Sequence, residues 1–195
     1  EHNLKNVSIE IPRDRLVVRG AIAAVAIADL PPGARLGTSS PRRAAQVKRL
    51  RPDLVTTLLR GNVQTRLAKL EAGDVDATLL AAAGLDRLAM HDVGAPQAID
   101  RLLPAASQGA IGIECRADDA ATFALLKAID HAPTHRAVAA ERALLAALGG
   151  DCRSPVAAYA HWQADGSLRL DAELYSDDGA EHVAGHAIVV GEDDA

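Results

Sequence analysis

Arginine and hydroxyl side chains gather at two points where an apolar segment gives way to a helical pattern. The run GTSSPRR at Gly37–Arg43 begins a helix, with Ser40 suited to the N-cap and Pro41 to the first turn. The run RGN repeats this arrangement after the apolar segment Leu54–Leu59, with Asn62 as the predicted N-cap. A helix N-terminus presents unpaired backbone N–H groups and the positive end of the helix dipole. Arginines added at that position predict a site for a carboxylate or a phosphate.

The arginines recur in successive strand–helix units. The apolar run Ala77–Ala83 predicts a third buried strand, and Arg87 follows Gly84 at the predicted start of another short helix. In open α/β folds the ligand lies at the carboxyl ends of the parallel strands, where these arginines would meet. A single arginine at such a position is more often solvated or paired with an acidic residue, so the recurrence is what favours binding. These residues by themselves predict an α/β domain that binds a polyanion.

Composition argues against several classes of protein. The net charge of the 195 residues is −5, whereas a general nucleic-acid-binding domain is normally basic. Aromatic residues make up 2%, too few for stacking platforms. No segment is apolar over the length of a bilayer, and the start lacks the regions of a signal peptide. The two cysteines form no disulfide framework and lie in no metal-binding pattern, so a cytoplasmic location and no metal are expected.

The hydrophobic pattern changes after the predicted α/β block. Helices are predicted at Ala120–Ile129 and Thr134–Leu148, the second with Thr134 as its N-cap. Before them, Ala110–Cys115 is predicted as a strand by its length and isoleucine content. Runs separated by Asp-Gly turns then predict an antiparallel sheet of three strands, at Val156–Trp162, Leu168–Leu174 and His182–Val190. The C-terminal end is therefore predicted to be a small α+β unit.

Cys152 is the candidate nucleophile. It follows the glycine pair that ends the second helix and precedes Arg153. An accessible loop with a basic neighbour favours thiolate reactivity, although Asp151 opposes it and a helix end adds no help from the dipole. Cys115, inside the predicted strand, is expected to be a small buried apolar residue.

Five motifs, in their order and spacing, resemble the porphobilinogen deaminase family, also called hydroxymethylbilane synthases. They are LGTSSPRRAAQ, LRGNVQTRLAKLEAGDVDA, AAGLDRL, SQGAIGIECR and AERALLAALGGDC. The resemblance extends from His2 to about Val190. It implies an α/β fold with a parallel or mixed sheet like that of periplasmic binding proteins, and a small α+β C-terminal domain with a three-stranded antiparallel sheet and a helix. It also implies a transferase of heme and porphyrin (tetrapyrrole) biosynthesis, which condenses four porphobilinogen units onto a dipyrromethane cofactor with loss of ammonia.

The resemblance also implies roles for individual residues. Cys152 matches the cysteine that carries dipyrromethane through a thioether, and Lys5 matches a lysine that contacts it. Because every pyrrole carries an acetate and a propionate, many charge-assisted hydrogen bonds are expected. The family positions that hold these carboxylates are matched by Ser40, Arg42, Arg43, Arg60, Arg66 and Arg87, and the same motifs contain Thr38, Ser39, Gly61 and Gln108. The implied partner is porphobilinogen, with no nucleic acid and no membrane.

At the family's catalytic position, this chain departs from the family motif. Asn6 stands where the motif HSxKDxP has its catalytic aspartate. An amide supplies neither the negative charge nor an ordinary titrating proton. Two hypotheses follow: the transferase itself, or a catalytically impaired or inactive homologue that at most binds pyrrole polycarboxylates. A phosphate- or nucleic-acid-binding module is a third class, which the charge and the scarce aromatic residues disfavour.

Compared with the family, the chain is expected to be truncated at both ends. Most of domain 1 upstream of His2 and the closing helix after the last strand have no counterpart. We therefore expect a remnant of domain 1 at 1–28 and 105–128, a domain 2 at 29–104, and a partial domain 3 with the cofactor cysteine at 129–195.

Overall fold

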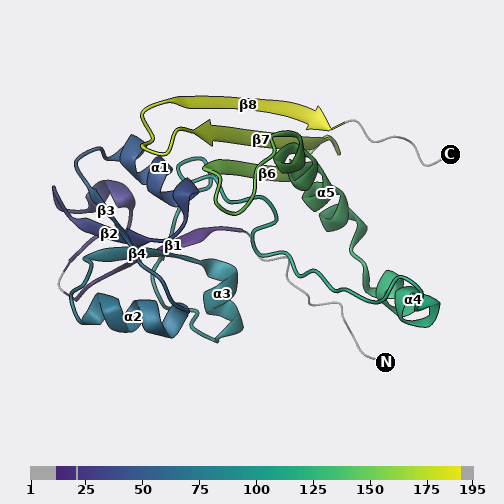
Figure 1. Ribbon diagram of the computed structural model, residues 1–195, viewed down its shortest axis with the longest axis horizontal. Coiled ribbons are helices and arrows are strands. Elements are labelled where there is room, and N and C mark those ends of the chain that lie inside the picture. The colour runs from purple at the N-terminus through teal and green to yellow at the C-terminus, as the bar shows by residue number, and fades with distance from the viewer. Residues whose placement is uncertain (1–11, 21, 190–195) are drawn as a thin grey trace.

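The chain forms a five-stranded sheet and a three-stranded sheet, which a computed structural model describes over residues 12–20 and 22–189 (Figure 1). The larger sheet has the strand order β3-β2-β4-β1-β5. Its strands are β1 (Asp14–Val18), β2 (Arg35–Thr38), β3 (Val55–Leu58), β4 (Ala77–Ala81) and β5 (Ala95–Pro96). β2 is parallel to β3 and β4, whereas β1 is antiparallel to β4 and β5. The predicted α/β class is confirmed, with a mixed sheet.

Helices cover both faces of this sheet. α1 (Pro41–Leu50) lies between the two sheets, while α2 (Val63–Glu71) and α3 (Ala82–Arg87) lie on the opposite face (Figure 1). Successive side chains of a strand point to opposite faces, so Leu16 joins one apolar cluster and Val17 the other. Burial on both faces explains why β4 is almost continuously apolar rather than alternating. A short 3-10 helix, η2 (Ile27–Asp29), adds Ile27 to the core on the α1 side.

The predicted helix starts are confirmed in the α/β region. Ser40 and Asn62 are the N-caps of α1 and α2, and their side chains accept from Arg43 N and Thr65 N. The prediction for Arg87 was wrong, because this residue ends α3 instead of opening a helix. α3 begins directly at the end of β4, so its N-terminus precedes Gly84.

The predicted three-stranded antiparallel sheet is confirmed, with the order β6-β7-β8. Its strands are β6 (Val156–Trp162), β7 (Leu168–Tyr175) and β8 (His182–Val189). α5 (Ala132–Ala147) packs on β6, and Trp162 Nε1 donates to the carbonyl oxygen of Pro133. The predicted N-cap of α5 was wrong: His131 caps it, because its Nδ1 accepts from Thr134 N.

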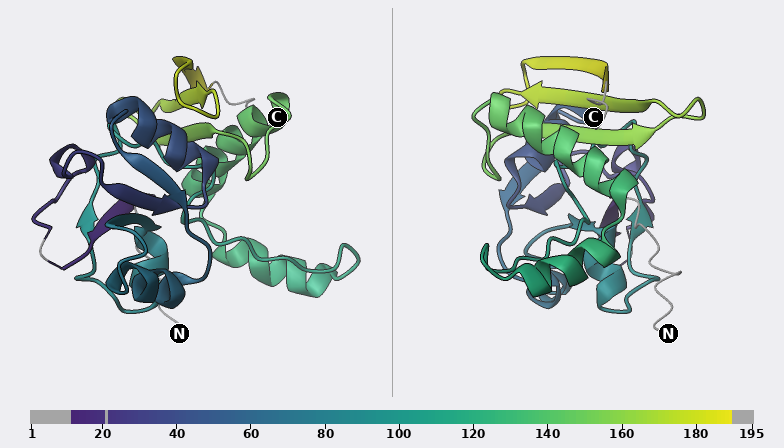
Figure 2. Two further views of the ribbon diagram at one scale, coloured as in Figure 1. Left: turned by 60° about the vertical axis from the view of Figure 1, so that its left-hand side comes forward. Right: turned by 90° about the vertical axis from the view of Figure 1, so that its right-hand side faces the viewer.

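The predicted strand at Ala110–Cys115 is not formed in the described part of the chain, although α4 (Ala120–Ile129) has its predicted bounds. The segment runs beside α4 in an arm that projects from the rest of the protein (Figure 2). Ile111 and Ile113 are exposed there and Cys115 is half-buried rather than buried. Isoleucine content favours a strand, but a strand needs a hydrogen-bonded partner, which this segment lacks among the described residues.

Two findings bear on the membrane and domain predictions. Over the described residues, no helix combines the length and the apolar character needed to cross a bilayer. β1, from the predicted domain 1 remnant, lies in the same sheet as β2, β3 and β4 of the predicted domain 2. The division of the chain into three domains remains a prediction.

The turn between β7 and β8 docks on α1 through Gly179, and this contact gives a first prediction. Gly179 has φ +73°, and a Cβ atom there would lie 2.4 Å from the carbonyl oxygen of Ala45. Gly166, in the turn between β6 and β7, has φ +83° but no atom near its Cβ position. We expect Gly166→Ala to lower the free energy of unfolding by about 1 kcal/mol and Gly179→Ala by about 2–3 kcal/mol. Urea denaturation of both variants checks this, and equal losses would mean that the turn is free of α1.

Candidate functional site

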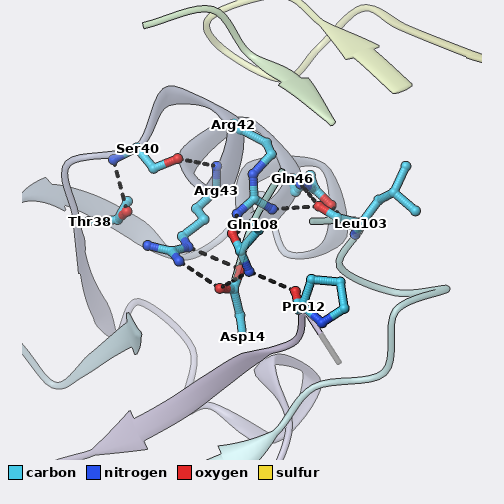
Figure 3. Close-up of polar contacts among 9 residues, drawn as sticks. All are labelled: Pro12, Asp14, Thr38, Ser40, Arg42, Arg43, Gln46, Leu103 and Gln108. Atoms are coloured by element: carbon cyan, nitrogen blue, oxygen red, sulfur yellow. Dashed lines mark hydrogen bonds and ion pairs between the residues drawn. The ribbon is translucent and has the colours of Figure 1, made fainter. Parts of the chain in front are cut away.

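Asp14 binds two arginine side chains at the start of α1 (Figure 3). Arg43 donates from Nε and Nη2 to Asp14 Oδ2 and Oδ1, at 3.0 and 2.6 Å. Arg42 donates from Nη2 to Asp14 Oδ2 at 3.0 Å. Gln108 Nε2 donates to Asp14 Oδ1 at 2.9 Å, and Gln108 Oε1 accepts from Arg42. We call Asp14, Arg42, Arg43 and Gln108 the Asp14 cluster.

The direction of β1 explains why these residues meet. The parallel strands β2, β3 and β4 have their carboxyl ends at one edge of the sheet, and α1 begins at that edge. β1 runs the other way, and Asp14 at its amino end lies opposite Ala81 at the carboxyl end of β4. Asp14 therefore lies at the edge of the sheet where the sequence predicted only arginines. Sequence reasoning missed Asp14, and the only available signal was a carboxylate at the first position of an apolar strand.

The three charged side chains of the Asp14 cluster are almost entirely shielded from water, whereas Gln108 is half-buried. The Asp14 side chain is completely buried, and those of Arg42 and Arg43 are 3% and 11% exposed. Burial raises the pKa of Asp14, but the guanidiniums of Arg43 and Arg42 outweigh it and hold the pKa below its ordinary value. Two guanidiniums face one carboxylate, so the cluster keeps an excess of positive charge. This excess of positive charge favours the binding of a further anion.

Arg66 adds another guanidinium beside this cluster. Its Nε donates to the carbonyl oxygen of Gly61 at 2.9 Å, and its Nη2 donates to Ser39 Oγ at 3.1 Å. Among the described residues Arg66 pairs with no carboxylate. Burial lowers the pKa of Arg66, and the nearby charge of Arg43 lowers it further. The positive charges of Arg43 on α1 and Arg66 on α2 are therefore close enough to repel each other.

Hydroxyl groups and a depression in the surface lie at the same edge. Thr38 Oγ1 accepts from Ser40 N at 3.1 Å, which holds the strand-to-helix turn. A shallow cavity of about 200 Å³ is lined by Thr38, Ser39, Ser40, Pro41, Ala44, Thr56, Thr57 and Leu58. A cavity at a helix N-terminus with two serines suits a carboxylate group.

The remaining predicted arginines are placed less centrally. Arg87 Nη2 donates to the carbonyl oxygen of Gly109 at 2.7 Å, next to Gln108. Arg60 is exposed, and its carbonyl oxygen accepts from Lys69 Nζ at 3.1 Å. The structure therefore brings Arg42, Arg43 and Arg66 together, places Arg87 at the Gln108 loop and leaves Arg60 at the surface. Lys5 and Asn6 lie outside the described residues.

Cys152 is exposed in the loop between α5 and β6, as predicted. Its neighbours Asp151 and Arg153 form an ion pair of 2.6 Å with each other. Three residues later, the carbonyl oxygen of Pro155 accepts from Tyr175 N at the last residue of β7, and β7 contacts α1. No hydrogen bond or ion pair joins Cys152 to the Asp14 cluster among the described residues. The thiol is thus available to a reagent and sits on the unit that packs against α1.

A larger cavity, of about 660 Å³, lies on the polar face of the three-stranded sheet. Its charged groups are already satisfied in part, because Arg169 binds both carboxylate oxygens of Asp171. Asp171 and Glu173 also give this cavity an acidic lining that opposes a carboxylate ligand. The cavity at the start of α1 is smaller and is lined by none of the four residues of the Asp14 cluster, but the arginines of the cluster and Arg66 lie at the same edge of the sheet.

Two family models match the chain. "Porphobilinogen deaminase, dipyromethane cofactor binding domain" matches residues 5–124, and "Porphobilinogen deaminase, C-terminal domain" matches residues 135–195. The chain belongs to the porphobilinogen deaminase family. The Asp14 cluster and Arg66 lie within the first match, and Cys152 lies within the second.

Curated porphobilinogen deaminases are similar over most of this chain. One from Sphingopyxis alaskensis is 82% identical over 178 residues, which are 91% of this chain and 56% of the relative. One from Thermobifida fusca is 48% identical and one from Desulforudis audaxviator is 50% identical, over 88% and 89% of this chain and 53% and 55% of those relatives. The chain spans about half the length of the porphobilinogen deaminases it matches.

Proposed function

We propose that this protein acts as a porphobilinogen deaminase (hydroxymethylbilane synthase) in tetrapyrrole biosynthesis. In that reaction four porphobilinogen units are condensed in turn, with loss of ammonia, onto dipyrromethane attached to Cys152. The observation that carries the proposal is the excess of guanidinium charge at the start of α1, where Arg42 and Arg43 share one carboxylate and Arg66 has none among the described residues. The matched family descriptions and the similar curated proteins support the same activity.

The residues present fit a dipyrromethane cofactor. Cys152 offers an exposed thiol for a thioether, and Arg43 and Arg66 offer donors that match carboxylate groups. When bound, the cofactor supplies the pyrrole carbon to which each new unit is joined. The arginines bind acetate and propionate groups and so fix the orientation of each pyrrole, which removes much of the entropic cost of joining two molecules. Ser39 and Ser40 add hydroxyl donors at the same helix start.

Asp14 and Gln108 also hold the arginine side chains in a fixed orientation before a ligand binds. A guanidinium with a fixed partner loses less side-chain entropy when it binds a carboxylate than a free one does. Arg43 is fixed through both Nε and Nη2, and Arg42 also donates to the carbonyl oxygen of Leu103.

We infer a cytoplasmic location for the protein because Cys115 and Cys152 are both unpaired, as is usual in a reducing compartment.

The intact mass of the purified protein tests this proposal. After expression with a supply of porphobilinogen, we expect the mass to exceed that of the sequence by one dipyrromethane. Cys152→Ser should abolish the increment, and Cys115→Ser should keep it because Cys115 is half-buried in the segment before α4. An unmodified wild-type mass would contradict the proposal and favour an inactive homologue that at most binds pyrrole polycarboxylates.

A further inference from the structure

The carboxylate of Glu141 connects three segments of the chain. Glu141 lies on α5 and is 5% exposed. Its Oε2 accepts from Ser107 N at 2.6 Å, and its Oε1 accepts from Ala160 N at 2.8 Å. Burial raises the pKa of Glu141, and the two backbone N–H groups oppose that rise. A buried carboxylate that accepts from two backbone amides fixes both of them, because each oxygen has its own donor.

Each of these amides belongs to a segment that matters for the proposed site. Ser107 precedes Gln108, which binds Asp14, Arg42 and the carbonyl oxygen of Pro12. Ala160 lies in β6, and Cys152 lies in the loop that joins α5 to β6. Glu141 therefore ties both stems of the Cys152 loop to the turn that carries Gln108.

The Ser107 turn needs such a restraint. Ser107 has φ +62°, a left-handed conformation that a serine rarely adopts. The adjoining segment has one further link to the same strand, since Ala158 N donates to the carbonyl oxygen of Pro104 at 3.0 Å. Without Glu141, the Ser107 amide would be left to find another partner, and the turn would lose its tie to α5.

We propose that Glu141 is a positioning residue that sets the distance between the Cys152 loop and the Asp14 cluster. The importance of this distance for catalysis rests on the proposed function, because only an enzyme with a cofactor on Cys152 needs the distance to be fixed. The geometric part stands independently of activity.

The proposal is tested by a distance measurement that needs no cofactor. Spin labels are placed at Leu148→Cys, at the end of α5, and Val55→Cys, on β3, in the full chain with Cys115→Ser and Cys152→Ser. Both positions are at least 40% exposed, so they accept a label. We expect double electron–electron resonance to give one narrow distance distribution with Glu141, and a wider or shifted one with Glu141→Gln. Glutamine keeps one acceptor oxygen but turns an NH₂ donor toward the other amide.

Matched variants separate positioning from stability. Glu71→Gln, an exposed glutamate on α2, should leave the distance distribution unchanged. Glu141→Asp keeps the charge but is one methylene shorter, and we expect an intermediate widening. If Glu141→Gln lowers the melting temperature while the distance distribution of the folded protein is unchanged, Glu141 is merely structural and the proposal is overturned.

Two further readouts complete the test. If both Glu141 variants fail to fold, amide hydrogen exchange of the wild-type protein decides: Ser107 and Ala160 should be protected to the same degree, and rapid exchange at Ser107 would overturn the proposal. In protein that retains Cys152, we expect Glu141→Gln to reduce the fraction loaded with dipyrromethane. A wild-type protein that never loads the cofactor but shows the distance effect would contradict the proposed function and leave the positioning role intact.

Discussion

Replacing Asp14 with asparagine is expected to lower the free energy of unfolding by about 3–5 kcal/mol. The substitution keeps the shape of the side chain but leaves the guanidiniums of Arg42 and Arg43 buried without a counter-charge. Because most domains are stable by only about 5–15 kcal/mol, this loss removes a large part of the total. Urea denaturation followed by far-UV circular dichroism at pH 7 measures it.

Asp53→Asn is the matched control for this substitution. Asp53 also pairs with an arginine, Arg51, at 2.6 Å, but its side chain is 42% exposed. A solvent-exposed pair contributes little, so we expect a loss of no more than about 1 kcal/mol. Equal losses for the two substitutions would show that burial does not set the strength of the Asp14 pair.

The pH dependence of stability gives a second check on Asp14. Since its pKa is lower in the folded protein than in the unfolded chain, the charged carboxylate stabilises the fold above the unfolded pKa of about 3.9. That contribution is lost as the pH falls through the folded pKa. The difference in unfolding free energy between wild type and Asp14→Asn should therefore be constant from pH 5 to pH 7 and narrow below about pH 4. A difference that does not narrow would mean that Asp14 is not charged in the folded protein.

Local signals in the sequence were sufficient for much of the fold. The N-caps Ser40 and Asn62 act within one helical turn, so the residue types alone identify where α1 and α2 begin. The turns of the three-stranded sheet are similarly local, which explains why its strands were predicted closely. His131 was missed because an imidazole nitrogen is an unusual cap, and Thr134 three residues further on has the commoner side chain.

The candidate site could be predicted only in part, because its acidic component depends on chain direction. A βα unit places its arginines at the carboxyl edge whatever the rest of the fold does. Whether Asp14 joins them depends on β1 being antiparallel to β4, and an apolar run carries no sign of its direction. Glu141 was missed for a related reason, since its two amide partners are 34 and 19 residues away in the sequence. Long-range hydrogen bonds of this kind leave no local pattern.

Arg66 differs from the arginines of the Asp14 cluster in what it does for stability. Its hydrogen bonds go to Gly61 and to Ser39, and the nearby charge of Arg43 disfavours its own charged state. Removing the charge therefore relieves repulsion instead of exposing a buried ion. We expect Arg66→Gln to change the free energy of unfolding by less than about 0.5 kcal/mol.

The same substitution should weaken ligand binding strongly, because a bound carboxylate gains a charge-assisted hydrogen bond from Arg66 that glutamine cannot replace. Such a bond contributes about 1.5–3 kcal/mol, so the affinity for porphobilinogen is expected to fall about 10- to 100-fold. Isothermal titration calorimetry in the Cys152→Ser protein measures binding without covalent attachment. Arg116→Gln, at a side chain that is 82% exposed and paired with Asp119, is the control and should leave the affinity unchanged. If Arg66→Gln bound porphobilinogen as tightly as the control, the charge between α1 and α2 would have no part in holding the substrate, and the carboxylates would have to be bound elsewhere.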